Sequence, residues 1–392
     1  MNPRLVVVIS HPIQYFTPLY AELTRRGNLD LHVVFLSDAG DSPYHDTGFD
    51  RVMTWDIPLM DGYASSVLRP GLDLDSLGFW SISSPDLSGT LTRLAPDAIL
   101  LSGYASRLSW QALGWARRHG CRVMYTGDSN AKVPTRRWRQ WVKKLVVGAY
   151  FSQIDVFLCA SEAGLDYLVR FGARAEAIWR IPFAIDVRRF SAKFWEAGAQ
   201  RKYDFVWAGK LLPRKRPEDF IEALKLVAGI AGRKVRALLI GDGPMRDAIS
   251  EMADSLPDAC ELDLRGFVNQ MAMPQSLQEA ETFVFTSVDE PYGLVATEAA
   301  AAGLALIVAE GIGCVGDTVL ARPGKNAIIY PPRDVQTLAS AMLTLLKDGD
   351  RRRRMQQASL DIAQEHDYTV AAGIIEEAVR DACGMARLKE TA

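Results

Sequence analysis

Two glutamates in the stretch DEPYGLVATEAAAAG (289–303) have a type and spacing that could do chemistry. The run from Leu294 is rich in strong helix formers, so we expect a helix that begins at Gly293 or Leu294. Glu290 then lies in the loop before the helix, and Glu298 lies about one turn inside it. The N–H groups at a helix start can bind a diphosphate, and a carboxylate can accept two hydrogen bonds from a ribose. In the alternative interpretation, this is a solvated helix with an exposed glutamate.

Two lysines in GKLLPRKRP (209–217) could supply the positive charge that a diphosphate needs. Lys210 and Lys215 come directly after an apolar run that is typical of a buried strand. Ammonium groups form charge-assisted hydrogen bonds with phosphate oxygens. In the alternative interpretation, Lys215 is one more cation on the exposed surface where the next helix begins.

Several segments agree in order and spacing with one known family. The E-(seven residues)-E stretch 289–303 and the basic segment 209–217 resemble motifs of the retaining GT-B glycosyltransferases, specifically glycosyltransferase family 4. IGDGP (240–244) resembles the family's glycine turn after the second strand of the C-terminal domain, and RGFV (265–268) the segment that usually meets the base. RIPFAIDVRRF (180–190) is similar to the family's interdomain segment.

The resemblance implies a role for each matching residue. Glu298 would bind the ribose hydroxyls and Glu290 the donor sugar, while Lys210 and Lys215 would neutralise the leaving diphosphate in place of a metal ion. Lys210 stands where arginine is usual, which keeps the charge but removes a bidentate fork. The donor site implied by the resemblance comprises Gly209, Lys210, Lys215, Gly241, Asp242, Gly243, Phe267, Val268, Glu290, Glu298 and the backbone N–H groups of Tyr292, Gly293 and Leu294.

Short β-branched runs alternate with helical patterns along the chain, which indicates parallel sheets with crossover helices. We predict an α/β protein with the GT-B architecture, in which two Rossmann-like, doubly wound parallel-sheet domains face each other across a cleft. Such sheets bind ligands at the carboxyl ends of their strands. The predicted strands are Leu5–Ile9, Leu31–Leu36, Ala98–Leu101, Arg122–Tyr125, Val156–Cys159, Ala177–Ile181, Phe205–Ala208, Arg236–Ile240, Glu261–Arg265, Thr282–Phe285, Ala305–Val308 and Ala327–Ile329.

The domain boundaries follow from the change in pattern after residue 182. We place an N-terminal, acceptor-binding domain at 1–182, an interdomain linker at 183–203 and a C-terminal, nucleotide-sugar-binding domain at 204–365. Residues 366–392 have a helical pattern and are too few for a domain. We expect this tail to pack back on the N-terminal domain.

Two residues of the N-terminal half are candidates for catalysis. His11 lies in SHPIQYFTPLYAEL (10–23), which follows the first strand, and could contact the acceptor or act in catalysis; a structural histidine in this turn is the alternative. Asp128, in VMYTGDSN (123–130), stands where many relatives have a histidine. It could contact the donor sugar or orient the acceptor hydroxyl; a helix N-cap is the alternative.

A basic and aromatic segment, TRRWRQWVKKLVVGAYF (135–151), has the pattern of an interfacial helix. Peripheral contact with the inner face of the membrane would suit a lipid-linked acceptor. In the alternative, Trp138 and Trp141 pack into the core of the N-terminal domain. The run RRRR (351–354) is interpreted as an exposed helix.

The composition excludes several classes of protein. Of 392 residues, 48% are apolar and 23% charged, and the net charge of −2 gives no global attraction to nucleic acid. Five dispersed cysteines without a CxxC motif indicate a cytoplasmic protein without a zinc site, and we predict no metal and no cofactor beyond the sugar donor. GIGCVG (311–316) has the spacing of a dinucleotide fingerprint, but the next strand follows too soon for the required helix.

We therefore predict a retaining hexosyl-type glycosyltransferase that moves a sugar from a nucleotide-diphosphate donor to a hydroxyl of a glycan or lipid-linked acceptor. Two alternatives stay open: a nucleotide-sugar epimerase of the same twin-domain plan, and a non-catalytic nucleotide-sugar-binding subunit.

Overall fold

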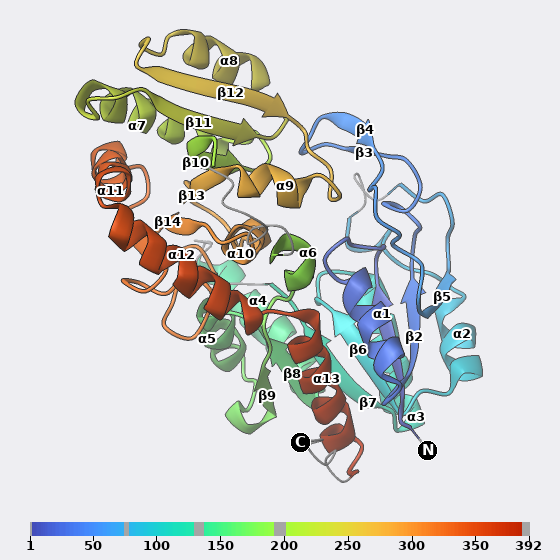
Figure 1. The fold of residues 1–392 in the computed structure, drawn as a ribbon. Helices are drawn as coiled ribbons and strands as arrows, with labels where there is room; N and C mark the ends of the chain where they lie inside the picture. The colour runs from blue at the N-terminus through green and yellow to red at the C-terminus, as the bar shows by residue number, and fades with distance from the viewer. Residues whose placement is uncertain (1, 74–77, 129–136, 192–200, 386–392) are drawn as a thin grey trace. The chain divides into compact units, whose positions relative to one another are not determined.

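The computed structural model describes residues 2–73, 78–128, 137–191 and 201–385, with the side chains of 137–140 left out. Within these residues the chain divides into two compact units (Figure 1). The first unit comprises residues up to Tyr44, Met53–Ala184 and the chain from Tyr368; the second comprises His45–Val52 and Ile185–Asp367. The predicted boundaries placed residues 45–52 in the N-terminal domain, whereas the structure groups them with the second unit.

The first unit is built on a seven-stranded sheet in the order β5-β2-β1-β6-β7-β8-β9, with every neighbouring pair parallel. Alternate residues of β1 point to opposite faces: Val6 and Val8 join one hydrophobic core, while Leu5 and Val7 join the other. Its elements are β1 (Arg4–Ile9), α1 (Thr17–Arg26), β2 (Asp30–Phe35), β5 (Ala64–Val67), α2 (Leu87–Leu94), β6 (Ala98–Ser102), α3 (Arg107–His119), β7 (Arg122–Thr126), α4 (Arg137–Phe151), β8 (Val156–Cys159), α5 (Glu162–Arg170), η1 (Ala175–Ala177), β9 (Ile178–Arg180) and α13 (Tyr368–Ala382).

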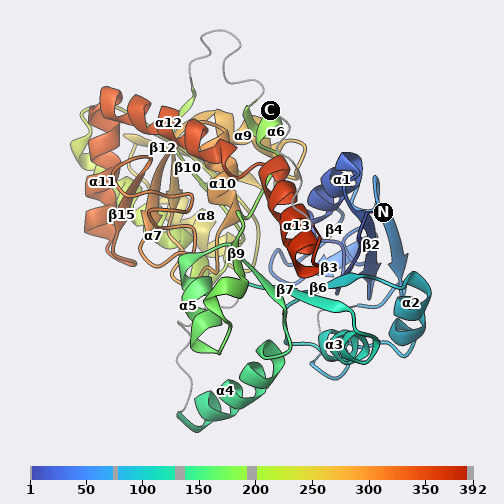
Figure 2. The same cartoon turned by 90° about the horizontal axis from the view of Figure 1, so that it is seen from below.

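Helices cover both faces of this sheet. Residues of α2, α3, α4 and α5 complete one core, and residues of α1 and α13 complete the other (Figure 2). The C-terminal helix α13 packs on α1, where Arg26 donates two hydrogen bonds, at 2.8 and 2.9 Å, to the buried carboxylate of Glu376. Asn28 donates a third, at 3.0 Å. The first unit is therefore a doubly wound sheet closed by the last helix of the chain.

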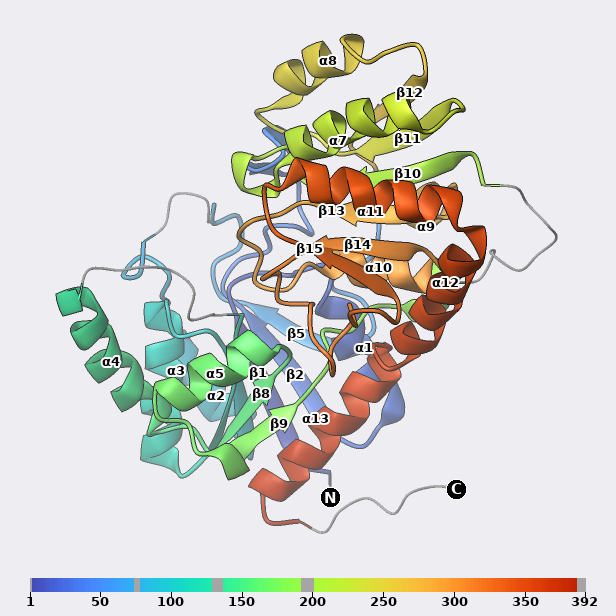
Figure 3. The same ribbon diagram turned by 90° about the vertical axis from the view of Figure 1, so that its left-hand side faces the viewer.

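The second unit is built on a six-stranded parallel sheet in the order β12-β11-β10-β13-β14-β15. α7 and α11 pack on each other, as do α10 and α12 (Figure 3). Its elements are α6 (Val187–Ser191), β10 (Tyr203–Ala208), η2 (Pro213–Lys215), α7 (Pro217–Ile230), β11 (Val235–Ile240), α8 (Arg246–Asp254), β12 (Cys260–Gly266), α9 (Met273–Gln278), β13 (Ala280–Phe285), α10 (Leu294–Ala301), β14 (Ala305–Ala309), β15 (Ala327–Tyr330), α11 (Val335–Lys347) and α12 (Gly349–Gln364).

All twelve predicted strands are present within one or two residues of their predicted ends. Three short strands were missed: β5, and the pair β3 (Tyr44–Asp46) and β4 (Arg51–Met53). β5 has the sequence ASSV and is at most half-buried, so it carries little of the apolar pattern that indicates a strand. Among the described helices, none is both long and apolar enough to cross a membrane.

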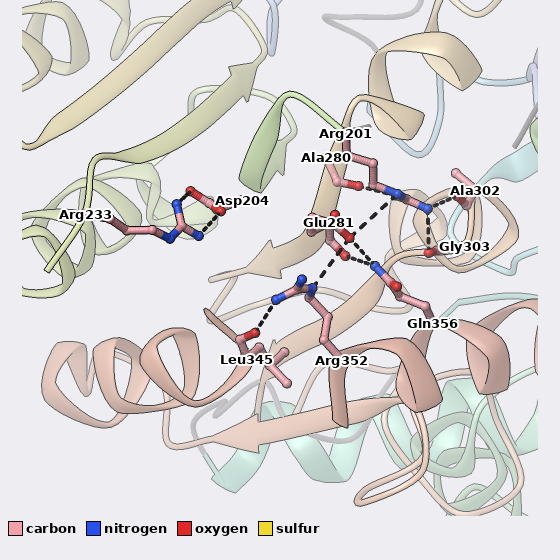
Figure 4. Close-up of polar contacts among 10 residues, drawn as sticks. All are labelled: Arg201, Asp204, Arg233, Ala280, Glu281, Ala302, Gly303, Leu345, Arg352 and Gln356. Atoms are coloured by element: carbon pink, nitrogen blue, oxygen red, sulfur yellow. Dashed lines mark hydrogen bonds and ion pairs between the residues drawn. The ribbon is translucent and has the colours of Figure 1, made fainter. Parts of the chain in front are cut away.

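A network of charges ties the amino ends of the second unit's strands to α12 (Figure 4). Arg201 donates to the carbonyl oxygens of Ala280 and, at 2.9 Å, Gly303, and its Nε lies 3.9 Å from the carboxylate of Glu281. Gln356 donates to that carboxylate at 2.7 Å, and Arg352 lies 3.5 Å from it. The prediction that RRRR (351–354) is simply exposed is therefore wrong for Arg352.

Candidate active site

The residues that the sequence assigned to a donor site gather at one edge of the second unit's sheet. Lys210 follows β10, the turn Gly241–Gly243 follows β11, Phe267 follows β12 and the loop with Glu290 follows β13. Since these strands are parallel neighbours, their carboxyl ends meet at the same edge. This is the edge at which doubly wound sheets bind ligands.

The glycine turn after β11 lies directly against the turn after β10. A Cβ atom on Gly241, whose φ is +155°, would lie 2.0 Å from the carbonyl oxygen of Gly209. The two turns are joined by a hydrogen bond from the N–H of Leu211 to the carbonyl of Asp242, at 2.9 Å. Glycine is therefore needed at 241 so that the backbones can approach, and this approach fixes the position of Lys210.

Lys215 and Glu290 form an ion pair that is largely removed from solvent. The ammonium of Lys215 contacts the carboxylate of Glu290, and each side chain is 12% exposed. Burial lowers the pKa of Lys215, and the charge of Glu290 opposes that change. Arg214 lies 3.8 Å from the same carboxylate but is 45% exposed. Removing Glu290 would leave the buried Lys215 charge without its counterion, and removing Lys215 would leave Glu290 with only the more exposed Arg214 among the described residues; both changes are costly.

The backbone around this pair is fixed by side chains at the ends of two strands. Thr286 donates a hydrogen bond to the carbonyl of Lys215 at 2.7 Å, and Trp207 donates to the Thr286 hydroxyl at 2.9 Å. Gly293 has φ +94°, and a Cβ atom there would lie 2.4 Å from the ring of Phe285. The helix α10 begins at Leu294, as predicted. Its first N–H groups have no acceptor within the helix.

Glu298 lies inside the protein. It is 1% exposed, which makes the alternative of an exposed glutamate wrong. Burial raises the pKa of Glu298 to about 7, against the opposing effects of the Arg189 charge and a hydrogen bond from Gln270. Arg189 in turn donates to Gln270 at 2.7 Å. Within the described residues the Oε1 atom of Glu298 has no hydrogen-bond partner, so it retains the capacity to accept a hydrogen bond.

The loop after β14 packs on the loop that carries Glu290. The N–H of Gly313 donates to the carbonyl of Glu290 at 3.2 Å, and the N–H of Cys314 to the carbonyl of Tyr292 at 3.1 Å. The segment 311–316 contains no helix, in agreement with the rejection of a dinucleotide fingerprint. Gly313 serves close packing instead, because a Cβ atom there would lie 1.7 Å from the carbonyl of Pro291.

Lys210 has a partner that sequence reasoning missed. Its ammonium donates to both carboxylate oxygens of Asp46, at 2.7 and 2.9 Å. Arg189 and Gln270, which reach Glu298, were missed as well. Arg189 could have been identified from the sequence, because it lies in the segment 180–190 that resembles the family's interdomain segment. Asp46 could not, because no local pattern connects residue 46 with residue 210.

His11 and Asp128 belong to the first unit and follow the carboxyl ends of β1 and β7. His11 is half-buried, with Nδ1 2.9 Å from the hydroxyl of Ser10. Asp128 is exposed. The alternative, in which Asp128 caps the start of a helix, concerns the segment 129–136, which lies outside the described residues. The two residues share one edge of the sheet but are separated there by the end of β6.

Comparison with known proteins gives matches in both halves of the chain. A family model described as glycosyl transferases group 1 matches residues 190–361, and one described as glycosyl transferase 4-like domain matches residues 12–184. The chain belongs to the family 4 type of GT-B glycosyltransferases. Over 323 residues the glycosyltransferase is 23% identical to the GDP-mannose-dependent alpha-(1-6)-phosphatidylinositol dimannoside mannosyltransferase of Mycobacterium tuberculosis, covering 78% of this chain and 81% of that one.

Other relatives agree with this assignment. The sulfoquinovosyl transferase of Arabidopsis thaliana is 25% identical over 301 residues, which are 74% of this glycosyltransferase and 57% of the relative. Among solved structures, Anabaena HepE in complex with UDP and glucose has a TM-score of 0.68 at 16% identity, covering 97% of this chain and 100% of that one. Sucrose-phosphate synthase of Thermosynechococcus elongatus has a TM-score of 0.70 at 18% identity, covering 97% and 99%. These structures confirm the predicted GT-B fold, and the relatives favour a glycosyltransferase over the epimerase and the binding subunit.

Proposed function

We propose that this glycosyltransferase binds a nucleotide-diphosphate sugar at the carboxyl edge of the second unit's sheet and transfers a hexose-type sugar, with retention, to a hydroxyl. The observation that carries the proposal is the buried Lys215–Glu290 pair beside the start of α10, together with the buried, incompletely paired carboxylate of Glu298. The mannosyltransferase relative is named as GDP-mannose-dependent, which supports a donor of this class.

The chemistry requires stabilisation of a leaving diphosphate. When the bond between the anomeric carbon and the phosphate oxygen breaks, its electron pair goes to the diphosphate. Lys215, Lys210 and the first N–H groups of α10 would stabilise that charge, and donors fixed before the reaction usually supply the largest electrostatic share of catalysis. Because Lys215 is buried, its interaction with a phosphate is less screened than on the surface. These groups would take the role that a metal ion has elsewhere, so we propose a metal-independent reaction.

We propose the remaining donor contacts from the resemblance to the family. Glu298 would accept hydrogen bonds from the ribose through Oε1, Glu290 would contact the sugar, and Phe267 and Val268 would contact the base. In the first unit, His11 would contact the acceptor or act in catalysis, and Asp128 would contact the donor sugar or orient the acceptor hydroxyl, since both follow carboxyl ends of strands.

We also propose that α4 contacts the inner face of a membrane, where a lipid-linked acceptor would be found. Four apolar side chains of α4 are exposed at positions that share one helix face: Trp141 (71%), Val142 (52%), Leu145 (70%) and Val146 (48%). The alternative that Trp141 packs in the core is wrong, whereas the side chain of Trp138 lies outside the described residues. Five free cysteines support a cytoplasmic location.

The membrane proposal is tested by sedimentation with anionic phosphatidylglycerol vesicles. We expect the Leu145→Ser and Trp141→Ser variants to lose vesicle binding while keeping their melting temperature. Ile230→Ser, at an exposed apolar residue (60%) of the second unit, is the matched control. Equal vesicle binding by all variants would contradict the proposal.

The function is tested by donor turnover. We expect release of nucleoside diphosphate from UDP- or GDP-sugars to require an added acceptor, and the product to keep the donor's anomeric configuration in its NMR spectrum. An epimerase would convert the donor without an acceptor. A binding subunit would bind UDP or GDP and release nothing, and an inverted product would overturn the retaining mechanism.

A further inference from the structure

The second unit includes one short segment from the first half of the chain, residues His45–Val52, which we call the 45–52 segment. It contains the end of β3, the start of β4 and the turn between them, and these two strands form a separate two-stranded sheet. Its contacts are with residues that the proposed function assigns to the donor, so its chemistry bears directly on that site.

Asp46 is bound in the way that an anionic ligand would be. Its carboxylate accepts hydrogen bonds from Lys210 at 2.7 and 2.9 Å and from the N–H groups of Gly48 and Phe49 at 2.9 and 3.0 Å. The Asp46 side chain is 12% exposed and that of Lys210 is 33% exposed. Burial alone would raise the pKa of Asp46, but the hydrogen bonds from Lys210, Phe49 and Gly48 outweigh it and hold the pKa below its usual value.

The rest of the segment packs on the neighbouring donor residues. The ring of Phe49 lies 4.9 Å from that of Phe267, edge to face, and Arg51 lies 5.0 Å from the same ring. Arg51 also lies 3.6 Å from the carboxylate of Asp242. The backbone of Gly48 lies against Lys210, where a Cβ atom would come within 2.8 Å of Nζ. The segment is therefore placed over Lys210 by contacts with two further strand-end loops.

A carboxylate and a phosphate oxygen offer Lys210 the same acceptor chemistry, and both carry negative charge. While Asp46 holds Lys210, the charge of the ammonium is neutralised and two of its three N–H groups are used. A diphosphate that approached the intact pair would meet a neighbouring carboxylate of like charge, which disfavours binding.

We propose that Asp46 is an internal ligand of the diphosphate site, which occupies Lys210 in the absence of donor and is exchanged for the donor's diphosphate on binding. The proposal rests on the proposed function, because it takes Lys210 as a diphosphate-binding residue. Asp46 then sets the affinity for the donor: each binding event replaces one anion on Lys210 by another. No covalent bond changes in this exchange.

The proposal is tested by calorimetric titration of the full chain with UDP and GDP, and with uridine and guanosine. Asp46→Asn keeps an oxygen for the Gly48 and Phe49 N–H groups but removes the charge. We expect nucleoside diphosphates to bind the variant roughly three- to tenfold more tightly, with nucleoside binding unchanged. Asp46→Ser is the second variant, because its hydroxyl can still accept a hydrogen bond from the backbone N–H groups. The melting temperature of each variant shows whether it is folded.

Two controls isolate the Lys210 contact. Asp50→Asn removes a carboxylate of the same segment that is 67% exposed and lies 3.9 Å from His45, and we expect it to leave nucleotide affinity unchanged. In a Lys210→Ala background, Asp46→Asn should no longer tighten binding, because the cation that Asp46 occupies is gone.

The outcomes separate this inference from the proposed function. Tighter diphosphate binding that depends on Lys210 supports the exchange. Equal or weaker binding of nucleoside diphosphates by both Asp46 variants overturns the exchange but leaves the proposed donor site in place. Weaker binding would show that Asp46 positions Lys210. Failure of UDP and GDP to bind the wild type and every variant would overturn the proposed donor site itself, and the inference with it.

Discussion

The two ends of the second unit's sheet both contain buried charges, but they use them differently. At the amino end, the carboxylate of Glu281 is surrounded by Arg201, Arg352 and Gln356, and Arg201 also donates to backbone carbonyls. At the carboxyl end, the carboxylate of Glu298 has one amide donor, and Oε1 has no hydrogen-bond partner within the described chain.

The difference indicates which end has capacity for a ligand. At the amino end the Nε atom of Arg352 also has no hydrogen-bond partner within the described residues, but it lies 3.5 Å from Glu281. A charge that is surrounded by opposite charges and donors in this way stabilises the fold and has little left to offer a substrate. A buried carboxylate with an unused acceptor, beside a buried ammonium and a helix start, carries a cost that a ligand can remove. We therefore expect changes at the carboxyl end to affect activity and changes at the amino end to affect stability.

The largest expected effect is on catalysis at the carboxyl end. Glu290→Gln and Lys215→Ala should each lower kcat by roughly a hundred- to a thousandfold, as expected for loss of a fixed charge at the reacting group. Arg214→Ala, which removes a more exposed cation 3.8 Å from Glu290, should lower kcat by less than about tenfold. Donor turnover under saturating acceptor measures both. Near-normal turnover by Lys215→Ala would show that the buried pair serves the fold, as at the other end.

The next effect is on stability at the amino end. Arg201→Met removes a buried cation and leaves the carbonyl oxygens of Ala280 and Gly303 without their donor, so the free energy of unfolding should fall by roughly 1–3 kcal/mol. Activity per folded molecule should not change. Arg353→Ala, at a residue of α12 that is 68% exposed, is the control and should cost less than about 0.5 kcal/mol. Urea unfolding measures the stability, and a loss of turnover in a folded Arg201→Met enzyme would remove the distinction between the two ends.

A third effect is the pH dependence that the two ends should not share. Burial raises the pKa of Glu298 to about 7, so the ligand-free fold favours the protonated form. The protonated Glu298 side chain contributes to the stability of the folded protein. This contribution is fully present below pH 4.5, the usual pKa of a glutamate, and is lost as the pH rises through 7. For a fully buried group the loss amounts to about 3 kcal/mol. Glu298→Gln, which cannot ionise, should lack it.

Thermal unfolding of the ligand-free protein between pH 5 and 8 measures this effect. The wild type should lose stability relative to Glu298→Gln over that interval, and bound UDP or GDP should reduce the difference. Parallel curves for the two proteins would mean that Glu298 is already fully compensated in the ligand-free state.

The smallest expected effect is that of removing metal ions. If Lys215, Lys210 and the start of α10 are sufficient for the diphosphate, EDTA should leave donor turnover unchanged. Restoration of EDTA-inhibited activity by Mg²⁺ or Mn²⁺ would contradict this prediction. It would also mean that the lysines at the carboxyl end do not neutralise the diphosphate on their own.

Much of the fold was available in the sequence because the signals involved are local. β-branched runs marked twelve strands, and the alanine-rich run located the start of α10 at Leu294. The missed strand β5 lies at the edge of its sheet and carries two serines among its four residues, so it lacked the periodicity that marks a buried strand. The site followed from the sequence to the same extent: the Glu290–Glu298 spacing and the two lysines were visible, but their partners were not.

The sequence by itself determined where the strands and helices lie, which residue types follow each strand, and that Glu298 is about one turn inside a helix. These properties depend on neighbours within a few residues along the chain. Only the tertiary structure decided that Asp46 holds Lys210, that Gln270 connects Arg189 to Glu298, and that Arg352 reaches Glu281. Asp46 and Lys210 are 164 positions apart, and such a pair forms because the path of the backbone, not the local sequence, brings two charges out of water together.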